Sequence, residues 1–261
     1  NRSGPALHRF DEILPNLPDG EELDEDALLA NLQAIQERNG LPQQLSLEVN
    51  EGLVIEGAGN ESHRFPSFTV EMETGTGKTY VYLRTLFELN KAHGFLKFVI
   101  IVPSVAIYEG VRKSFEIMQP HFRSLYHNAV FHLIPYDGGN LGVLRAYASD
   151  TTGMVLLMTI DAFNKASNTL YKPSEKLPGE LLPFQFIQRT RPILILDEPQ
   201  SIDNTETAKK AVRTLHPLCA LRYSATHRVH PNQVYRLSPV DAYRQSLVKK
   251  IEVIGLRELS L

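Results

Sequence analysis

The chain has 261 residues, of which 43% are hydrophobic and 22% charged, a composition typical of a soluble globular protein with one or two domains. Its formal net charge of −3 excludes a general electrostatic attraction to nucleic acid, so any polynucleotide contact must come from a local group of residues. The single cysteine, Cys219, excludes an internal disulfide and a cysteine-based zinc cluster, and we expect it to be a small core residue in a reducing cytoplasm.

The chain carries no pattern typical of a membrane segment. Its longest apolar runs, such as residues 98–103 and 193–196, are far too short to span a bilayer, and no charged-then-apolar leader begins the sequence. We therefore expect no membrane partner. Because residue 1 is Asn rather than Met, we also expect the chain to be a fragment of a longer gene product.

Residues 1–64 are expected to form an extension ahead of the main domain. Prolines and glycines over residues 1–20 predict an irregular arm. Residues 24–40 predict a helix, because acidic residues begin it, apolar residues recur on one face and glycine ends it. Partial alternation over residues 45–55 predicts a hairpin. Four glutamines of this extension are expected at the surface: Gln33, Gln36, Gln43 and Gln44.

Residues 68–89 predict a strand, a glycine-rich loop and a helix. Residues 68–72 are mostly β-formers, residues 74–79 contain two glycines, and apolar residues then recur at helical spacing at Tyr82, Leu86 and Leu89. A loop in this position leaves backbone N–H groups unpaired at the positive end of the helix dipole. The arrangement therefore predicts a phosphate-binding loop, with an ordinary glycine-rich turn as the alternative.

The residue types of this loop suit a nucleotide. Gly75 and Gly77 permit backbone torsions and a close approach that a Cβ would block. Lys78 can place its ammonium against the outer phosphates, and the Thr79 hydroxyl can complete a Mg²⁺ shell. Met72 stands where the usual pattern has glycine, a departure that is frequent in helicase-type loops.

Beyond Gly94, buried strands alternate with helices. Strands are predicted at 97–103, 130–134, 155–158, 192–196 and 218–223, and helices at 105–111, 141–149 and 208–215. Residues 166–190, with several prolines and a glycine, predict a long surface excursion. The alternation predicts an α/β fold with a parallel, doubly wound sheet, in which ligands bind beyond the carboxyl ends of the strands.

Polar residues follow two of these strands directly. Asp197 and Glu198 come after strand 192–196, where one carboxylate can contact Mg²⁺ and the other can orient or deprotonate an attacking water. Ser224 and Thr226 follow strand 218–223 and can hydrogen-bond the acidic pair. The structural alternatives are a solvated surface pair for the acids and a capped turn for the hydroxyls.

These motifs resemble those of a known class of motors. Thr74-Gly-Thr-Gly-Lys-Thr79, Asp197-Glu-Pro-Gln200 and Ser224-Ala-Thr226 resemble motifs I, II and III of superfamily 2 helicases and translocases. More narrowly, four segments closely resemble the restriction (Res) subunit of type III restriction-modification enzymes: Met72–Tyr82, Val102–Ile107, Asp197–Gln200 and Arg222–His227. The resemblance covers the chain from about Phe65 to Val253.

The resemblance implies a RecA-like P-loop NTPase fold, three-layer α/β/α with a mainly parallel sheet. Residues 65–240 would be the first RecA-like ATPase domain, and residues 241–261 a segment leading toward a second motor domain outside this chain. The sequence contains no Glu-x-Lys or Asp-x-Lys triplet of the kind such nucleases use, and no arginine-finger motif is recognisable. Cleavage would therefore also lie outside the chain.

The resemblance further implies ATP and Mg²⁺ as cofactors and assigns a role to each matching residue. The cofactor-binding set is Thr74, Gly75, Thr76, Gly77, Lys78 and Thr79. Thr79 and Asp197 would bind the metal, and Glu198, Lys78 and Gln200 would be the catalytic residues, with Gln200 touching the γ-phosphate or motif III. Ser224 and Thr226 would couple hydrolysis to movement.

A third implied set contacts the DNA backbone through amides and hydroxyls, which hold phosphate without a net basic charge. It comprises Pro103, Ser104, Gly138, Gly139, Thr159 and Asn164. Ser104 is equally well explained as a helix N-cap.

The function implied is ATP-driven translocation on double-stranded DNA, for cleavage by a nuclease domain elsewhere. The implied partners are a modification methyltransferase (Mod) subunit and the second RecA-like and nuclease domains of the same polypeptide, in a bacterial cytoplasm. Two alternatives stay open: another superfamily 2 DNA or RNA helicase, and a nucleotide-binding switch without motor activity, in which Glu198 would be idle.

Overall fold

Parallel pairing dominates the sheet of the computed structural model, which describes residues 13–59, 62–175, 177, 181–227 and 229–249. Within these residues the strands form one sheet in the order β1-β2-β7-β6-β3-β5-β4, and β8 pairs with β2 as well. Every strand pair is parallel except β1 with β2. The strands are β1 (Val49–Asn50), β2 (Phe65–Met72), β3 (Lys97–Val102), β4 (Phe131–Pro135), β5 (Gly153–Thr159), β6 (Ile193–Asp197), β7 (Cys219–Ser224) and β8 (Gln233–Leu237).

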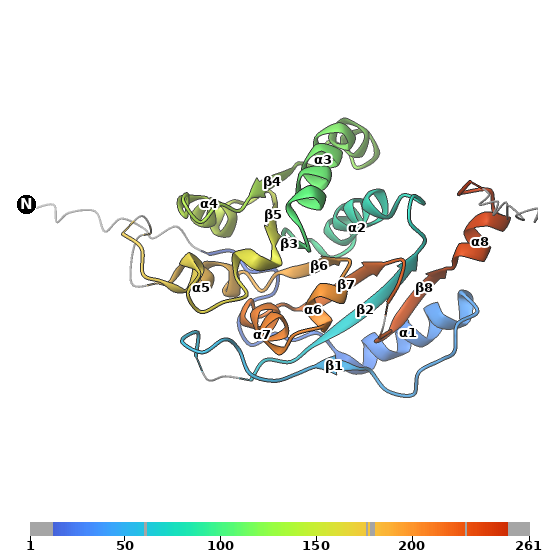
Figure 1. Cartoon of the computed structure of the whole chain (residues 1–261), viewed down its shortest axis with the longest axis horizontal. Helices are drawn as coiled ribbons and strands as arrows, with labels where there is room; N and C mark the ends of the chain where they lie inside the picture. The colour runs from blue at the N-terminus through green and yellow to red at the C-terminus, as the bar shows by residue number, and fades with distance from the viewer. Residues whose placement is uncertain (1–12, 60–61, 176, 178–180, 228, 250–261) are drawn as a thin grey trace, which may run out of the picture.

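Helices cover both faces of this sheet and make three layers (Figure 1). They are α1 (Glu25–Arg38), α2 (Lys78–His93), α3 (Val105–Leu125), α4 (Gly142–Ser149), α5 (Pro183–Gln188), α6 (Gln200–Asp203), α7 (Glu206–Thr214) and α8 (Pro239–Arg244), with short 3₁₀ turns η1 (Ile160–Ala162) and η2 (Thr169–Tyr171). The apolar residues of α2 and α3 pack on one face, and those of α4, α5, α6 and α7 on the other. The predicted α/β class with a mainly parallel sheet is confirmed.

Strand β3 shows why a continuous apolar run in the sequence predicts a strand inside this sheet. All of its residues are buried, because β5 and β6 flank it and helices cover both of its faces. Its alternate residues divide between the two cores: Val99 lies in one and Ile100 in the other. A strand in this position must be apolar on both sides, which is the continuous run that the sequence shows.

Two segments differ from the sequence prediction. Residues 45–55 form no hairpin of their own: β1 pairs antiparallel with the start of β2, where Asn50 lies opposite Phe65. The Asn50 amide also donates to Ser67 Oγ at 2.5 Å. The free edge of β2 is therefore a better partner for β1 than the residues that follow it, because it supplies backbone and side-chain hydrogen bonds together.

Residues 166–190 are the second difference, because the part of this segment that the structure describes is not wholly at the surface. Leu170 of η2 and Phe184 and Ile187 of α5 are almost fully buried in the core beside α4. Pro183 begins α5 rather than interrupting a helix, since its missing N–H costs nothing in the first turn. The prolines mark element ends here, while the apolar residues between them decide burial.

Gln36 corrects a smaller prediction, because it is buried, with 1% of its surface exposed. Its Nε2 donates to Gln44 Oε1 at 2.9 Å and to the Gln233 carbonyl at 3.0 Å, and its Oε1 accepts from the Gln44 N–H at 2.9 Å. The side chain thus joins α1 to β8, which explains why the extension lies against the edge of the sheet.

A stacked histidine pair fastens the segment before β2 to the turn before β7. The rings of His63 and His216 lie 4.5 Å apart between centroids with planes 7° from parallel, and His63 Nε2 contacts the Pro217 carbonyl at 3.0 Å. Burial lowers the pKa of His63, and burial together with the His63 charge lowers the pKa of His216 to about 4. Both rings are therefore neutral in the folded protein at neutral pH.

We predict that this pair makes the fold sensitive to acid. Since the folded protein disfavours protonated His216, its contribution to stability is complete above pH 6.5, the ordinary histidine value, and is lost as the pH falls toward 4. A His216→Asn variant, which tolerates the φ of 47° at this position, should lose less free energy of unfolding than the wild type between pH 6.5 and pH 4.5. Denaturant unfolding at both pH values measures this, and equal losses would show that His216 does not titrate on unfolding.

Candidate functional site

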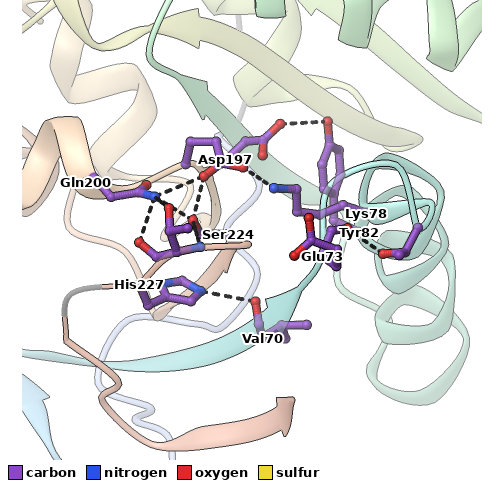
Figure 2. A network of polar contacts seen from close by, with 11 residues as sticks. Val70, Glu73, Lys78, Tyr82, Asp197, Gln200, Ser224 and His227 are labelled. Carbon is purple, nitrogen blue, oxygen red and sulfur yellow. Dashed lines mark hydrogen bonds and ion pairs between the residues drawn. The ribbon is translucent and has the colours of Figure 1, made fainter. Parts of the chain in front are cut away.

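Three loops meet at one end of the sheet, beyond the carboxyl ends of the strands, because their strands are neighbours that run in the same direction. The order β2-β7-β6 places the ends of these strands side by side. The loop after β2 carries Lys78, the turn after β6 carries Glu198, and the end of β7 carries Ser224. Figure 2 shows the side chains of these loops pointing toward one another.

The loop at residues 74–79 has the backbone that its glycines allow. Gly75 and Gly77 have φ of 80° and 92°, in the left-handed region that favours glycine. Apart from the adjoining backbone, no atom of the described residues lies within 4 Å of the place where a Cβ would be, so torsion rather than crowding requires these glycines. Gly77 is the N-cap of α2 and has no side chain to cap it, so the first amides of α2 have no side-chain cap and can donate to an anion.

Lys78 forms an ion pair with Glu198, its ammonium against Oε1 of the carboxylate, and both side chains are largely buried. Glu198 follows β6 in a tight turn with φ of 51°, a conformation that costs a residue other than glycine about 1 kcal/mol, and its N–H donates to the Tyr223 carbonyl at 2.9 Å. This backbone turn aims the carboxylate of Glu198 at the loop.

The second oxygen of Glu198 is held by two donors. Oε2 accepts from Ser224 Oγ at 2.5 Å and from Gln200 Nε2 at 3.1 Å. Burial alone would raise the pKa of Glu198, but the hydrogen bonds from Lys78, Ser224 and Gln200 outweigh it and leave the pKa below its ordinary value. Glu198 is therefore ionised at neutral pH.

The pKa of Asp197 is shifted in the opposite direction, upward from its ordinary value. It is the last residue of β6, with 7% of its surface exposed, and burial raises its pKa to about 6 against the opposing charge of Lys78. Its Oδ2 accepts from the Tyr82 hydroxyl at 3.4 Å, while its Oδ1 is buried and has no hydrogen-bond partner in the described part of the chain. A buried carboxylate oxygen without a donor is a strong candidate to ligate a hard cation.

The donor set fits Mg²⁺ bound together with a nucleotide. Among the described residues no three His, Cys, Asp or Glu side chains are grouped to hold a metal alone, and Mg²⁺ typically takes one or two protein ligands plus phosphates and waters. Asp197 can supply one ligand, and the Thr79 hydroxyl can supply another. The Tyr82 hydroxyl donates to the Asp197 carboxylate, a role that its helical spacing alone does not reveal. Burial, followed by the charge of Asp197, raises the pKa of Tyr82, which stays a neutral hydrogen-bonding group.

Gln200, the first residue of α6, connects the acidic turn to the end of β7. Its Nε2 lies within hydrogen-bond distance of four acceptors, namely Glu198 Oε2 (3.1 Å), Ser224 Oγ (2.6 Å), the Thr226 carbonyl (2.9 Å) and Thr226 Oγ1 (2.8 Å). An amide nitrogen carries only two hydrogens, so no more than two of these bonds form at once. Gln200 can therefore change partners between Glu198 and Thr226 without moving its backbone.

An ion pair that the motifs do not reveal lies behind this network. Arg222 of β7 donates to Asp203 of α6 at 2.5 Å, and their side chains are only 5% and 16% exposed. Since Asp203 is three residues after Gln200 and Arg222 is two residues before Ser224, the pair holds α6 against β7. No sequence motif marks it, because the two residues belong to different elements and become neighbours only in the sheet.

The residues implied to contact DNA lie at or beyond the ends of β3, β4 and β5, along the same edge of the sheet. Ser104 Oγ accepts from the Ile107 N–H at 3.4 Å and so caps α3, directly after Pro103. A Cβ on Gly138 would lie 2.6 Å from Thr169 Oγ1, so packing explains this glycine, and the Gly139 N–H donates to Asp137 Oδ1 at 2.8 Å.

The remaining two residues of that set flank η1. Thr159 ends β5, and Asn164 Nδ2 donates to Asp161 Oδ1 at 3.0 Å. The structure thus brings the set to the same edge of the sheet as the phosphate loop, and gives several of its members contacts within the chain.

The amino-acid sequence of this chain is similar to the sequences of one known protein family. The sequence model described as "Type III restriction enzyme, res subunit" matches residues 22–229. The Res subunit of the StyLTI enzyme of Salmonella typhimurium is 32% identical over an alignment of 218 residues, which covers 70% of this chain and 22% of that protein. The Res subunit of the EcoPI enzyme of Escherichia phage P1 is 30% identical over an alignment of 255 residues, which covers 88% of this chain and 24% of that protein. The chain thus spans less than a quarter of the length of these relatives.

Similar solved structures are more distant. A nuclease-deletion mutant of the Type ISP restriction-modification enzyme LlaGI in complex with a DNA substrate mimic has a TM-score of 0.46 and 12% identity, over 87% of this chain and 21% of that one. The SWI2/SNF2 ATPase core of Sulfolobus solfataricus in complex with dsDNA has a TM-score of 0.39 and 15% identity, over 82% of this chain and 33% of that one.

None of the helices in the described residues has the length and apolar character needed to cross a membrane.

We predict that breaking the Arg222–Asp203 pair destabilises the fold strongly. Removing one partner leaves the other charge buried, so Arg222→Met or Asp203→Leu alone should lower the free energy of unfolding by about 3 kcal/mol. The double substitution should recover much of this loss, because no unpaired charge is left. Denaturant unfolding of the four proteins measures both effects. Additive losses in the double variant would mean that the two side chains do not interact.

Proposed function

The chain belongs to the family of type III restriction enzyme Res subunits, and we propose that it is the first motor domain of such a subunit, which binds and hydrolyses ATP with Mg²⁺. The observation that carries this proposal is the meeting of Lys78, Asp197 and Glu198 at one edge of the sheet, with a buried oxygen of Asp197 left without a donor. A positive loop, a free carboxylate oxygen and an ionised glutamate together fit a metal-bound triphosphate.

The proposed domain is residues 65–240, with residues 1–64 as an extension and 241–261 as the segment leading toward a second motor domain. The packing of the extension supports a structural role for it. Gln36 of α1 hydrogen-bonds β8, and Asn39 donates to the Val234 carbonyl at 2.6 Å. Residues of α1 and its C-cap therefore cover β8, the strand that pairs with β2.

The residues of the site divide the work of hydrolysis between them. The amides of residues 75–79 would bind the phosphates, and Lys78 would exchange Glu198 for an outer phosphate when the nucleotide enters. Thr79 and Asp197 would ligate Mg²⁺, which when bound stabilises negative charge on the phosphates. Glu198 would then be released from Lys78 and held by Ser224 and Gln200, ready to accept a proton from the attacking water.

Gln200 would report the state of Glu198 to the rest of the protein. Its amide nitrogen can donate to Glu198 or to Thr226, so a change at the Glu198 carboxylate changes the hydrogen bond that Thr226 accepts. Ser224 and Thr226 would thereby couple hydrolysis to movement along double-stranded DNA. The residues at the ends of β3, β4 and β5 would contact the DNA backbone through amides and hydroxyls.

The partners proposed for the complete protein follow from the family. They are a modification methyltransferase (Mod) subunit, and the second RecA-like and nuclease domains of the same polypeptide, in the bacterial cytoplasm. The rival functions are another superfamily 2 helicase and a nucleotide-binding switch without motor activity. The position of Glu198 favours hydrolysis over the switch, since its carboxylate lies against Lys78 of the loop and is oriented there by Ser224 and Gln200.

We predict that a Glu198→Gln substitution in the full-length protein preserves ATP binding and lowers the rate of hydrolysis by about 100-fold or more, because the amide cannot accept a proton. Phosphate release measures hydrolysis, and a fluorescent ATP analogue measures binding. The matched control is Glu206→Gln, which alters a 71% exposed carboxylate on α7. Wild-type turnover in the Glu198 variant would favour the switch without motor activity.

We also predict that the 261-residue chain alone binds ATP weakly and hydrolyses it slowly. In motors of this kind a second domain supplies charges that stabilise the transferring phosphoryl group, and such charges are worth about 10³ or more in rate. Steady-state hydrolysis with and without double-stranded DNA tests this. Rapid, DNA-stimulated turnover by the isolated chain would mean that the site is already complete.

A further inference from the structure

A wide cleft of about 530 Å³ opens beside the entry to the phosphate loop. Glu73 and Thr74 line it on one side, and α8 with residues 248–249 lines it on the other. Its volume falls within the range of ligand sites in proteins, which is about 300–1,000 Å³. The site described above uses none of the residues from α8 onward, so the cleft asks for a separate explanation.

Backbone hydrogen bonds fix α8 next to the loop. Strand β8 runs parallel to β2 with Leu237 opposite Met72, and the Glu73 N–H donates to the Leu237 carbonyl at 3.1 Å. Ser238 then caps α8, accepting from the Asp241 N–H at 3.2 Å, so the helix begins where β2 gives way to the loop. Figure 1 shows α8 beyond the end of β8. These bonds therefore fix the start of α8, and with it one side of the cleft, next to the loop.

The lining is mostly apolar and includes an aromatic ring. Val240 and Tyr243 of α8 are 56% and 48% exposed, so both side chains are open to an occupant of the cleft. The ring of Tyr243 stacks on no other aromatic ring in the described part of the chain. An occupant with a flat apolar face and polar edges would cover both side chains and meet Glu73 and Thr74 at the rim.

We propose that this cleft binds the nucleobase of the nucleotide whose phosphates occupy residues 74–79, with Tyr243 as the stacking surface; the inference rests on the nucleotide site proposed above. The base and the triphosphate belong to one molecule, so their sites must adjoin, and Thr74 belongs both to the loop and to the cleft. A base has the flat faces and polar edges that the lining requires.

The glutamines of the N-terminal extension do not compete for this role. The Gln36 amide is fully engaged with Gln44 and Gln233, and its side chain is buried. The family match ends at residue 229, before β8 and α8, so a base site built from these elements lies outside the matched segment.

The test compares ligands with and without a base. Dissociation constants for ATP and for inorganic tripolyphosphate, both with Mg²⁺, are measured by calorimetry on the full-length protein and its variants. Tyr243→Ala should weaken ATP binding about 10-fold and leave tripolyphosphate binding unchanged, because base–aromatic stacking is lost. Val240→Arg, which fills the cleft, should have the same selective effect. Tyr243→Phe should bind both ligands as the wild type does.

The matched control is Leu247→Ala, which removes a 49% exposed apolar side chain from the same segment but outside the lining. It should change neither constant. Unchanged ATP binding in both cleft variants would overturn the proposal, and so would an equal loss for ATP and tripolyphosphate, which would mean that α8 only supports the loop. If the wild type binds neither ligand, the nucleotide site itself fails, an outcome distinct from failure of the cleft alone.

Discussion

The ion pair between Lys78 and Glu198 joins the phosphate loop to the acidic turn, and the rest of the site is arranged around it. The surrounding structure holds each partner in place. Lys78 is the first residue of α2, and Glu198 is held by its backbone turn, Ser224 and Gln200. The pair keeps Glu198 ionised in a largely buried position. A phosphate group is a stronger partner for an ammonium than a single carboxylate, so nucleotide binding should release the carboxylate. The contact between Lys78 and Glu198 is thus the one that nucleotide binding must exchange.

The site contains groups that are unfavourable for folding. Asp197 has a buried oxygen without a donor, and Glu198 adopts a left-handed backbone. Such features persist only where the surrounding structure determines them, and here β6 is buried along its whole length between β3 and β7. The core of the sheet therefore supports a turn that would be unstable on a surface loop, which explains why the acids directly follow the most apolar strands.

The sequence predicts most of the sheet and the location of the candidate site, but little of what connects its parts. Strands such as β3 are buried on both faces and show this as continuous apolar runs, and residues after parallel strands must share an edge. The pairing of β1 with β2, the burial of Leu170, Phe184 and Ile187, and the contacts of Gln36 depend instead on distant partners. The Arg222–Asp203 pair, the part played by Tyr82 and the cleft beside α8 are likewise absent from any local pattern, because each needs elements that meet only in the folded chain.

The most direct test of this account is a structure of the full-length protein with Mg²⁺ and an ATP analogue that resists hydrolysis. The account predicts that Lys78 Nζ leaves Glu198 and lies within hydrogen-bond distance of an outer phosphate oxygen. It also predicts Mg²⁺ coordinated by the phosphates near Asp197 and Thr79. A nucleotide bound elsewhere, with the Lys78–Glu198 pair intact, would contradict it.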